Sequence, residues 1–223
     1  MQIIQIAGIG RVGKTTLSLL IAKQLFNSGY IPVILPFAKA LKDMAQDLGY
    51  DKQKNSAKYR EFCQELGASK RKEDLDYWVK QTAQSVNTYN EKEKISKSTS
   101  APKKYILIQD DVRYMNELAF GMGINSFRIF LSAGSRPIQE EDAAWRKHES
   151  ETLNNNINNQ LMTSFFGKKN IEKKVDLTDL FNVVLLNDKT EEYLEAKVEK
   201  YISSWLDVTK HIDKLSLIKE LVK

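Results

Sequence analysis

A glycine-rich turn between a predicted strand and a predicted helix constrains this chain more than any other feature. The apolar run 2–7 predicts a buried strand and leads directly into Gly8-Ile9-Gly10-Arg11-Val12-Gly13-Lys14-Thr15-Thr16. The spacing G-x-x-x-x-G-K-T in this context predicts a phosphate-binding loop, because its glycines let successive backbone N–H groups point at an anion. The next helix adds the positive end of its dipole, so a glycine turn that binds nothing is disfavoured. Lys14 is expected to reach the β- and γ-phosphates of a nucleoside triphosphate, and the Thr15 hydroxyl to ligate Mg²⁺.

Composition narrows the class of protein. The 223 residues suffice for one sizeable α/β core, and 42% hydrophobic with 28% charged residues is ordinary for a globular protein. The single cysteine, Cys63, excludes a disulfide scaffold and fits a reducing compartment. The two histidines disfavour a His/Cys zinc site. Because no apolar run approaches the roughly 20 residues of a membrane span, we expect a cytoplasmic protein with no membrane partner.

The net charge of +5 raises the alternative of a nucleic-acid partner. The lysines are mixed with acidic residues, and no predicted helix carries a one-sided basic face interleaved with aromatic residues. A modest positive excess also suits an enzyme that collects polyanionic nucleotides. We therefore do not expect nucleic acid to be the main partner.

Strands alternate with helices along the chain. After a first helix from Lys14 to Gly29, further strands are predicted at 31–35, 105–109, 126–132 and 181–186, and further helices at 37–48, 56–66, 75–89, 115–120 and 191–205. The strand at 31–35 is expected to be buried, 69–72 to be a turn, and 90–104 to be a mobile loop. The alternation predicts an α/β protein of three layers, in which helices cover both faces of a mostly parallel sheet, with one domain over 1–223.

Charged residues follow the predicted strands at their carboxyl ends, where ligands of such sheets bind. Asp110 and Asp111 end the third strand, and Arg113 follows two residues later. Asp111 is expected to hold the water shell of Mg²⁺, and Arg113 to make a bidentate bond to phosphate oxygens. Arg136 and Arg146 suit a closing lid that neutralises charge on a transferring phosphoryl group. These residues supply the positioning and positive charge that phosphoryl transfer needs.

Each of these residues also has a structural interpretation that the sequence leaves open. The two aspartates suit a helix N-cap or a turn. Arg113 could pair with Glu117 four residues on. Arg136 and Arg146 could be solvated surface residues. Trp78 could pack in the core or lie under a substrate base.

Two other functional classes also fit in part. The chain lacks the Asp-x-x-Gly and Asn-Lys-x-Asp motifs of GTPases, and Ile9 occupies the place of the extra loop lysine of partitioning ATPases. A nucleotide-switched ATPase that acts on DNA or protein would still suit the Gly-Lys-Thr-Thr sequence and the positive charge. A non-catalytic nucleotide-binding module is a further alternative, against which the pairing of Asp111 with Arg113 argues.

Six sequence blocks follow the glycine turn in a fixed order. They are Pro-Phe-Ala-Lys-Ala-Leu-Lys at 36–42, Arg-Glu-Phe-Cys-Gln-Glu-Leu-Gly at 60–67, Asp-Tyr-Trp-Val at 76–79, Asp-Val-Arg-Tyr-Met-Asn-Glu at 111–117, His-Glu-Ser-Glu-Thr at 148–152 and Val-Leu-Leu-Asn at 184–187. Together they resemble the bacteriophage deoxynucleoside monophosphate kinases, a family related to the wider nucleoside monophosphate kinases with a P-loop NTPase fold. The resemblance covers roughly 1–202. Thr15 stands where that family often has aspartate, and the tail from Asp207 matches nothing in it.

The resemblance implies a role for each matched residue. The donor ATP would be bound by Gly8, Gly10, Arg11, Val12, Gly13, Lys14, Thr15 and Thr16, together with Arg146 of the lid and Asn187 near the donor base. The acceptor would be bound by Phe37, Lys39, Lys42, Arg71, Trp78, Asp111, Arg113 and Glu151. The catalytic residues would be Lys14, Asp111, Arg113 and Arg136, with Thr15 as the ligand of Mg²⁺.

The function that this resemblance implies is a cytoplasmic kinase in which ATP, assisted by Mg²⁺, phosphorylates a deoxynucleoside 5′-monophosphate to the diphosphate. Residues 36–89 would form a helical monophosphate-binding region and 133–152 a small lid. A homodimer is what the resemblance suggests. The sequence does not indicate which base is accepted.

Overall fold

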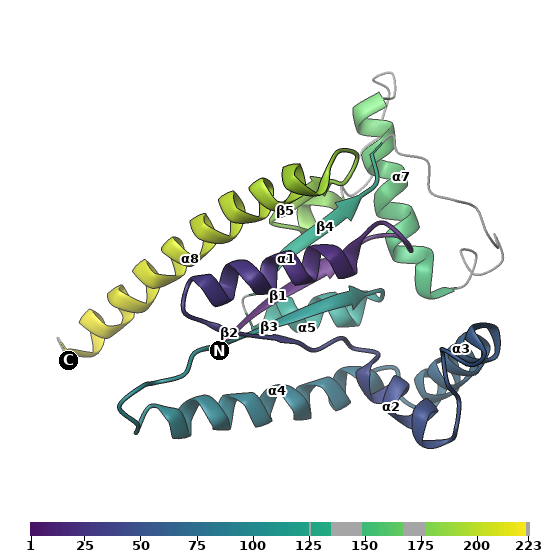
Figure 1. Cartoon of the computed structure of the whole chain (residues 1–223), viewed down its shortest axis with the longest axis horizontal. Helices are drawn as coiled ribbons and strands as arrows, with labels where there is room; N and C mark the ends of the chain where they lie inside the picture. The colour runs from purple at the N-terminus through teal and green to yellow at the C-terminus, as the bar shows by residue number, and fades with distance from the viewer. Residues whose placement is uncertain (125, 135–148, 167–176, 222–223) are drawn as a thin grey trace.

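Five apolar runs form one parallel sheet, as the sequence predicts (Figure 1). The computed structural model describes residues 1–124, 126–134, 149–166 and 177–221. The strands are β1 (Gln2–Ala7), β2 (Ile31–Ile34), β3 (Tyr105–Val112), β4 (Phe127–Ser132) and β5 (Val183–Leu186), in the spatial order β2-β3-β1-β4-β5. Every neighbouring pair is parallel, so all carboxyl ends lie at one edge.

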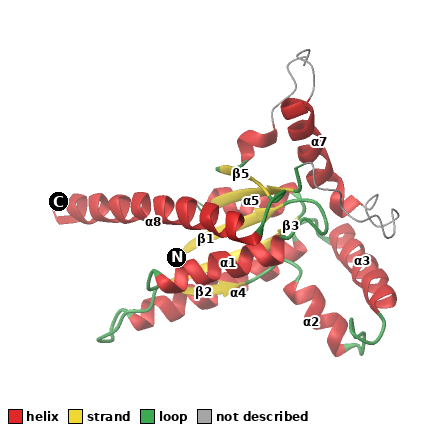
Figure 2. Ribbon diagram, turned by 45° about the horizontal axis from the view of Figure 1, so that its top comes forward, coloured by secondary structure: helices red, strands yellow, loops and turns green. Residues whose placement is uncertain are grey.

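Helices cover both faces of this sheet and make it the middle of three layers (Figure 2). The helices are α1 (Lys14–Asn27), α2 (Lys39–Asp47), α3 (Ser56–Glu73), α4 (Tyr77–Ser96), α5 (Met115–Gly123), α7 (Thr152–Phe166) and α8 (Glu191–Leu221), with the short 3₁₀ helices η1 (Glu149–Glu151) and η2 (Leu177–Leu180). Among the described residues, none of the helices combines the length and the apolar character that crossing a membrane requires.

The two sheet faces bury different helices. On one face, strand residues such as Ile4, Ile6 and Ile108 pack against α1 and α8. Ile21 of α1 and Val198 of α8 belong to the same buried cluster. On the other face, the alternate residues of the strands pack against α4, α5 and α7. Successive side chains of a strand point to opposite faces of the sheet. Whether a residue at the end of a strand meets α1 or α5 therefore depends on its position in this alternation.

Four predictions about individual elements are wrong. Strand β2 is half-buried, because it lies at the edge of the sheet. Residues 69–72 continue α3 to Glu73, and α8 continues to Leu221. Most of the predicted loop at 90–104 is also incorrect, since α4 reaches Ser96. Lysine and glutamate favour helices, which explains why these polar stretches extend them.

The carboxyl edge of the sheet gathers the candidate residues. Strand β1 lies between β3 and β4, and the chain places β2 and β3 on one side of it and β4 and β5 on the other. Such a reversal of strand order opens a crevice beyond the strand ends. Helices α2 and α3 project past this edge and face the start of α7 across it (Figure 1).

Candidate functional site

The glycine loop, residues 8–13, joins β1 to α1 in a conformation that needs its glycines. Gly8 has φ 148° and Gly13 has φ 102°, both in the region that side chains disfavour. A Cβ on Gly8 would collide with the carbonyl oxygen of Leu131, and one on Gly13 would lie 2.5 Å from Nδ2 of Asn187. Asn187 also donates a hydrogen bond of 2.9 Å to the Val12 carbonyl. The end of β5 thus supports this loop from behind.

Lys14 folds its side chain back over the loop. Its Nζ donates to the carbonyls of Gly8 at 2.6 Å and Ile9 at 2.9 Å. Burial, followed by the nearby positive charge of Arg113, lowers the pKa of Lys14 from 10.5 to about 8, against the opposing charges of three neighbouring carboxylates. An anion bound in the loop would therefore stabilise the charged form of Lys14 and raise its pKa.

Asp110, rather than Asp111, faces the start of α1. Ser18 Oγ donates to the Asp110 carboxylate at 3.3 Å and to the Thr15 carbonyl at 2.9 Å, and Thr15 itself is exposed. Burial and the adjacent charge of Asp111 raise the pKa of Asp110. A cation would relieve that repulsion, so the Asp110 carboxylate and the Thr15 hydroxyl fit Mg²⁺. This ion commonly takes one or two protein oxygens plus phosphate and water. The described residues contain no larger cluster of metal-ligating side chains.

Asp111 binds a backbone turn, and its charge also acts on the glycine loop, where it raises the pKa of Lys14. Its two carboxylate oxygens accept the N–H groups of Phe37 at 2.7 Å and Ala38 at 3.0 Å. These bonds fix the turn between β2 and α2 against the tip of β3. A carboxylate has about four acceptor sites and two are used here, so the role that Asp111 is expected to play toward the water shell of Mg²⁺ stays a prediction.

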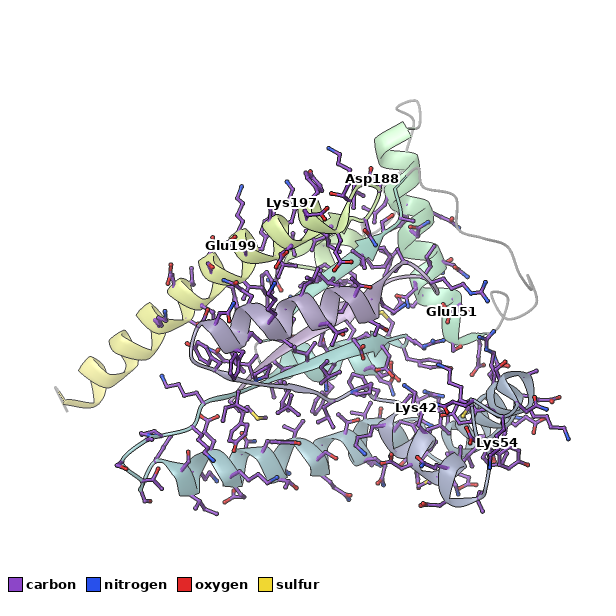
Figure 3. All side chains as sticks on the ribbon, in the orientation of Figure 1. Lys42, Lys54, Glu151, Asp188, Lys197 and Glu199 are labelled. Carbon is purple, nitrogen blue, oxygen red and sulfur yellow. The ribbon has the colours of Figure 1, made fainter. Side chains whose placement is uncertain are left out.

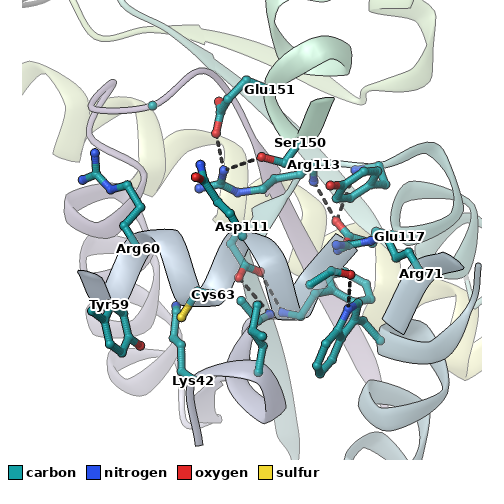
Figure 4. A pocket seen from close by; sticks show the side chains of 18 of the residues that line it. Lys42, Tyr59, Arg60, Cys63, Arg71, Asp111, Arg113, Glu117, Ser150 and Glu151 are labelled. Atoms are coloured by element: carbon teal, nitrogen blue, oxygen red, sulfur yellow. Dashed lines mark hydrogen bonds and ion pairs between the residues drawn. The ribbon is translucent and has the colours of Figure 1, made fainter. Parts of the chain in front are cut away.

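A pocket of about 360 Å³ lies between the glycine loop and helices α2, α3 and α4 (Figure 4). Gly10 and Arg11 of the loop line it on one side. The predicted acceptor residues that line it are Phe37, Lys42, Arg71, Trp78, Asp111, Arg113 and Glu151. Figure 3 shows Lys42 and Glu151 approaching this region from opposite sides, one from α2 and the other from the start of α7.

Arg113 pairs with Glu151 rather than with Glu117. Its Nη1 donates to the Glu151 carboxylate and, at 3.4 Å, to Ser150 Oγ. The side chain of Glu151 is 3% exposed and that of Arg113 is 40% exposed. Only the backbone N–H of Arg113 contacts Glu117, at 2.8 Å. The predicted alternative of a side-chain pair between Arg113 and Glu117 is therefore wrong.

A second arginine is held by a second buried acid. Arg71 Nη2 lies 3.3 Å from Glu117 Oε1, and its guanidinium stacks at 3.8 Å on the Tyr114 ring. Burial and the charge of Asp111 raise the pKa of Glu117 from 4.5 to about 7. Trp78 is buried and donates its ring N–H to the Gly67 carbonyl at 3.2 Å. Because it also lines the pocket, Trp78 belongs both to the packed interior and to the pocket wall.

The remaining predicted site residues fall into two groups. Lys39 does not line this pocket, since its Nζ pairs with Asp43 at 2.6 Å on the surface. Val12 is buried under the loop, and Thr16 is half-buried at the start of α1. Arg136 and Arg146 lie outside the described residues, as does most of the predicted lid.

Sequence reasoning missed several residues of the site. The alternation of β3 could have identified Asp110, because Ile106 and Ile108 of the same phase pack with α1. Glu117 ends the 111–117 block, but the sequence offered it only as a partner for Arg113. Tyr59 and Cys63 carry no comparable signal. Tyr59 and Cys63 line the far wall of the pocket and hydrogen-bond to each other through their side chains, with burial raising both pKa values.

The chain matches no protein-family model, and a search of curated proteins gave no match.

Proposed function

We propose that this protein is a kinase that transfers the γ-phosphoryl group of ATP to a deoxynucleoside 5′-monophosphate. One observation carries the proposal: a single pocket is lined both by Gly10 and Arg11 of the glycine loop and by two arginines held by buried acids. A donor phosphate in the loop and an acceptor in the pocket would therefore be neighbours. Phosphoryl transfer depends mainly on such positioning and on positive charge.

In this proposal each group of site residues has its own role. The glycine loop and Lys14 would bind the triphosphate, and Arg113 would bind the acceptor phosphate through the part of its guanidinium that faces the pocket. Phe37 and Trp78 would bound the acceptor on its apolar side. Mg²⁺ bound by Thr15 and Asp110 would neutralise charge on the β- and γ-phosphates.

The first test is loss of turnover when a proposed charge is removed. We expect Lys14→Ala and Arg113→Ala each to lower acceptor-dependent ADP release about 10²-fold or more, because each removes one preorganised donor of positive charge. Lys23→Ala is a matched control, since Lys23 lies on α1 but pairs with Glu195 on the surface. Wild-type turnover in either active-site variant would remove that residue from the mechanism.

A nucleotide-switched ATPase predicts a different pattern. Its ADP release would be indifferent to every monophosphate and would respond to DNA or to a protein. The same assay with and without acceptor separates the two functions. The pocket favours the kinase, because a switch ATPase has no need of a second lined cavity beside its loop.

A further inference from the structure

Glu151 is a buried acid placed on the arginine that the proposed function assigns to the acceptor. It ends η1 and lies at the start of α7, where its carboxylate meets Arg113 Nη1 (Figure 4). Resemblance implies that this glutamate binds substrate. It does line the pocket, but its side chain is only 3% exposed and its carboxylate is already paired with a protein residue.

The exposure of the two partners indicates which of them can meet a ligand. Both residues line the pocket, but Arg113 is 40% exposed and Glu151 is almost fully covered, so the guanidinium is the group of the two that a ligand can reach. Among the described residues, both side-chain partners of the guanidinium, Glu151 and Ser150, contact Nη1. Breaking this pair would leave a buried carboxylate without its cation, which is costly. The pair therefore persists when a ligand enters.

We propose that Glu151 is a positioning residue that holds Arg113 in one orientation, without itself touching the substrate. This inference rests on the proposed function for its effect on turnover. Its effect on the order of the Arg113 side chain does not depend on any activity. A fixed guanidinium meets the transferring group without reorganising, and small misplacements of such groups cost much of the rate.

The test replaces the Glu151 carboxylate with an uncharged amide of nearly the same shape. In Glu151→Gln we expect kcat with acceptor to fall about 10-fold, with the acceptor KM within about 3-fold of wild type, because the arginine is present but poorly oriented. The double variant R113A/E151Q should lose no more than Arg113→Ala alone, since Glu151 acts through Arg113. Glu149→Gln is the matched control, as Glu149 is the exposed acid of the same turn and does not line the pocket.

A second readout separates this inference from the kinase proposal. The guanidinium signals of Arg113, followed by NMR of ¹⁵N-labelled arginine and assigned with Arg113→Ala, should show faster rotation in Glu151→Gln and no change in Glu149→Gln. Equal rotation in the wild type and in Glu151→Gln, or further loss in the double variant, would overturn the positioning role. Failure of the wild type to phosphorylate any monophosphate would overturn the proposed function and leave the Arg113 result to decide the role of Glu151.

If Glu151→Gln does not fold, Glu151→Asp keeps the charge and retracts it by one methylene. We then expect kcat to fall and the Arg113 guanidinium to rotate faster than in the wild type, because the bond to Nη1 lengthens. A wild-type kcat in this variant would contradict the need for an oriented guanidinium.

Discussion

The side chain of Lys14 should make ATP binding by the glycine loop depend on pH. Burial and Arg113 lower its pKa to about 8 in the ligand-free protein. A bound triphosphate would stabilise the charged form and raise that pKa, so binding at pH 8 should take up a proton. We expect the affinity for ATP to fall as the pH rises above 8, and the binding enthalpy at pH 8 to depend on the ionisation enthalpy of the buffer.

Calorimetry in two buffers measures this uptake directly. Lys14→Arg keeps the charge but does not titrate in this range, so it should bind without the buffer dependence if it binds at all. Equal enthalpies in both buffers for the wild type would show that Lys14 is not the group that meets the phosphate.

Neighbouring aspartates of β3 should respond in opposite ways to the same substitution. Asp111→Asn leaves an amide that can accept only one of the two backbone N–H groups of the β2–α2 turn. We expect it to lower the free energy of unfolding by about 1–3 kcal/mol and to weaken acceptor binding. Asp110→Asn should instead keep stability and reduce the response of turnover to Mg²⁺.

Urea unfolding and a magnesium titration of turnover check this contrast. The account is contradicted if Asp110→Asn unfolds the protein while Asp111→Asn changes only the magnesium response.

At the scale of elements, α5 carries a buried acid that makes stability depend on pH. Glu117, in the first turn of α5, accepts the backbone N–H of Tyr114 at 3.2 Å, yet burial raises its pKa from 4.5 to about 7. Between these values the folded protein binds more protons than the unfolded chain, so stability should fall as the pH rises from 4.5 to 7. Glu117→Gln should reduce the loss of unfolding free energy between pH 4.5 and 7 by about 1 kcal/mol or more.

Urea unfolding at several pH values between 4.5 and 8 measures the slope. Glu61→Gln, which alters an exposed acid of α3, should leave it unchanged. A slope that is equal in the wild type and in Glu117→Gln would exclude Glu117 as its source.

Helices and strands were predictable where their periodicity is strong. The strands around β1 and β3 have buried aliphatic runs, and the glycines at 8 and 13 mark a turn that only glycine fits. The end of α4 was not predictable, because Ser96 closes it by bonding to Lys103 of the returning chain at 3.1 Å. That contact forms only once the chain has turned back. The edge position of β2 depends on strand order, which a single sequence does not contain.

At the scale of the whole molecule, the candidate site joins segments that are far apart in the sequence. Arg71 meets Glu117 and Arg113 meets Glu151 across the carboxyl edge of the sheet. The sequence drew attention to both arginines and to both acids, but it did not indicate which acid holds which arginine. Those pairings become visible only when α5 and the start of α7 pack beside β3. The residues of the site were therefore candidates from the sequence, whereas their contacts were not.

The central claim is that donor and acceptor meet in one site, and one measurement tests it most directly. ADP release from Mg-ATP is followed with each deoxy- and ribonucleoside monophosphate in turn, and without acceptor. The account predicts release that depends on one or a few deoxynucleoside monophosphates, with the matching diphosphate formed in equal amount. Release at the same rate with every acceptor and with none, and no diphosphate product, would contradict it.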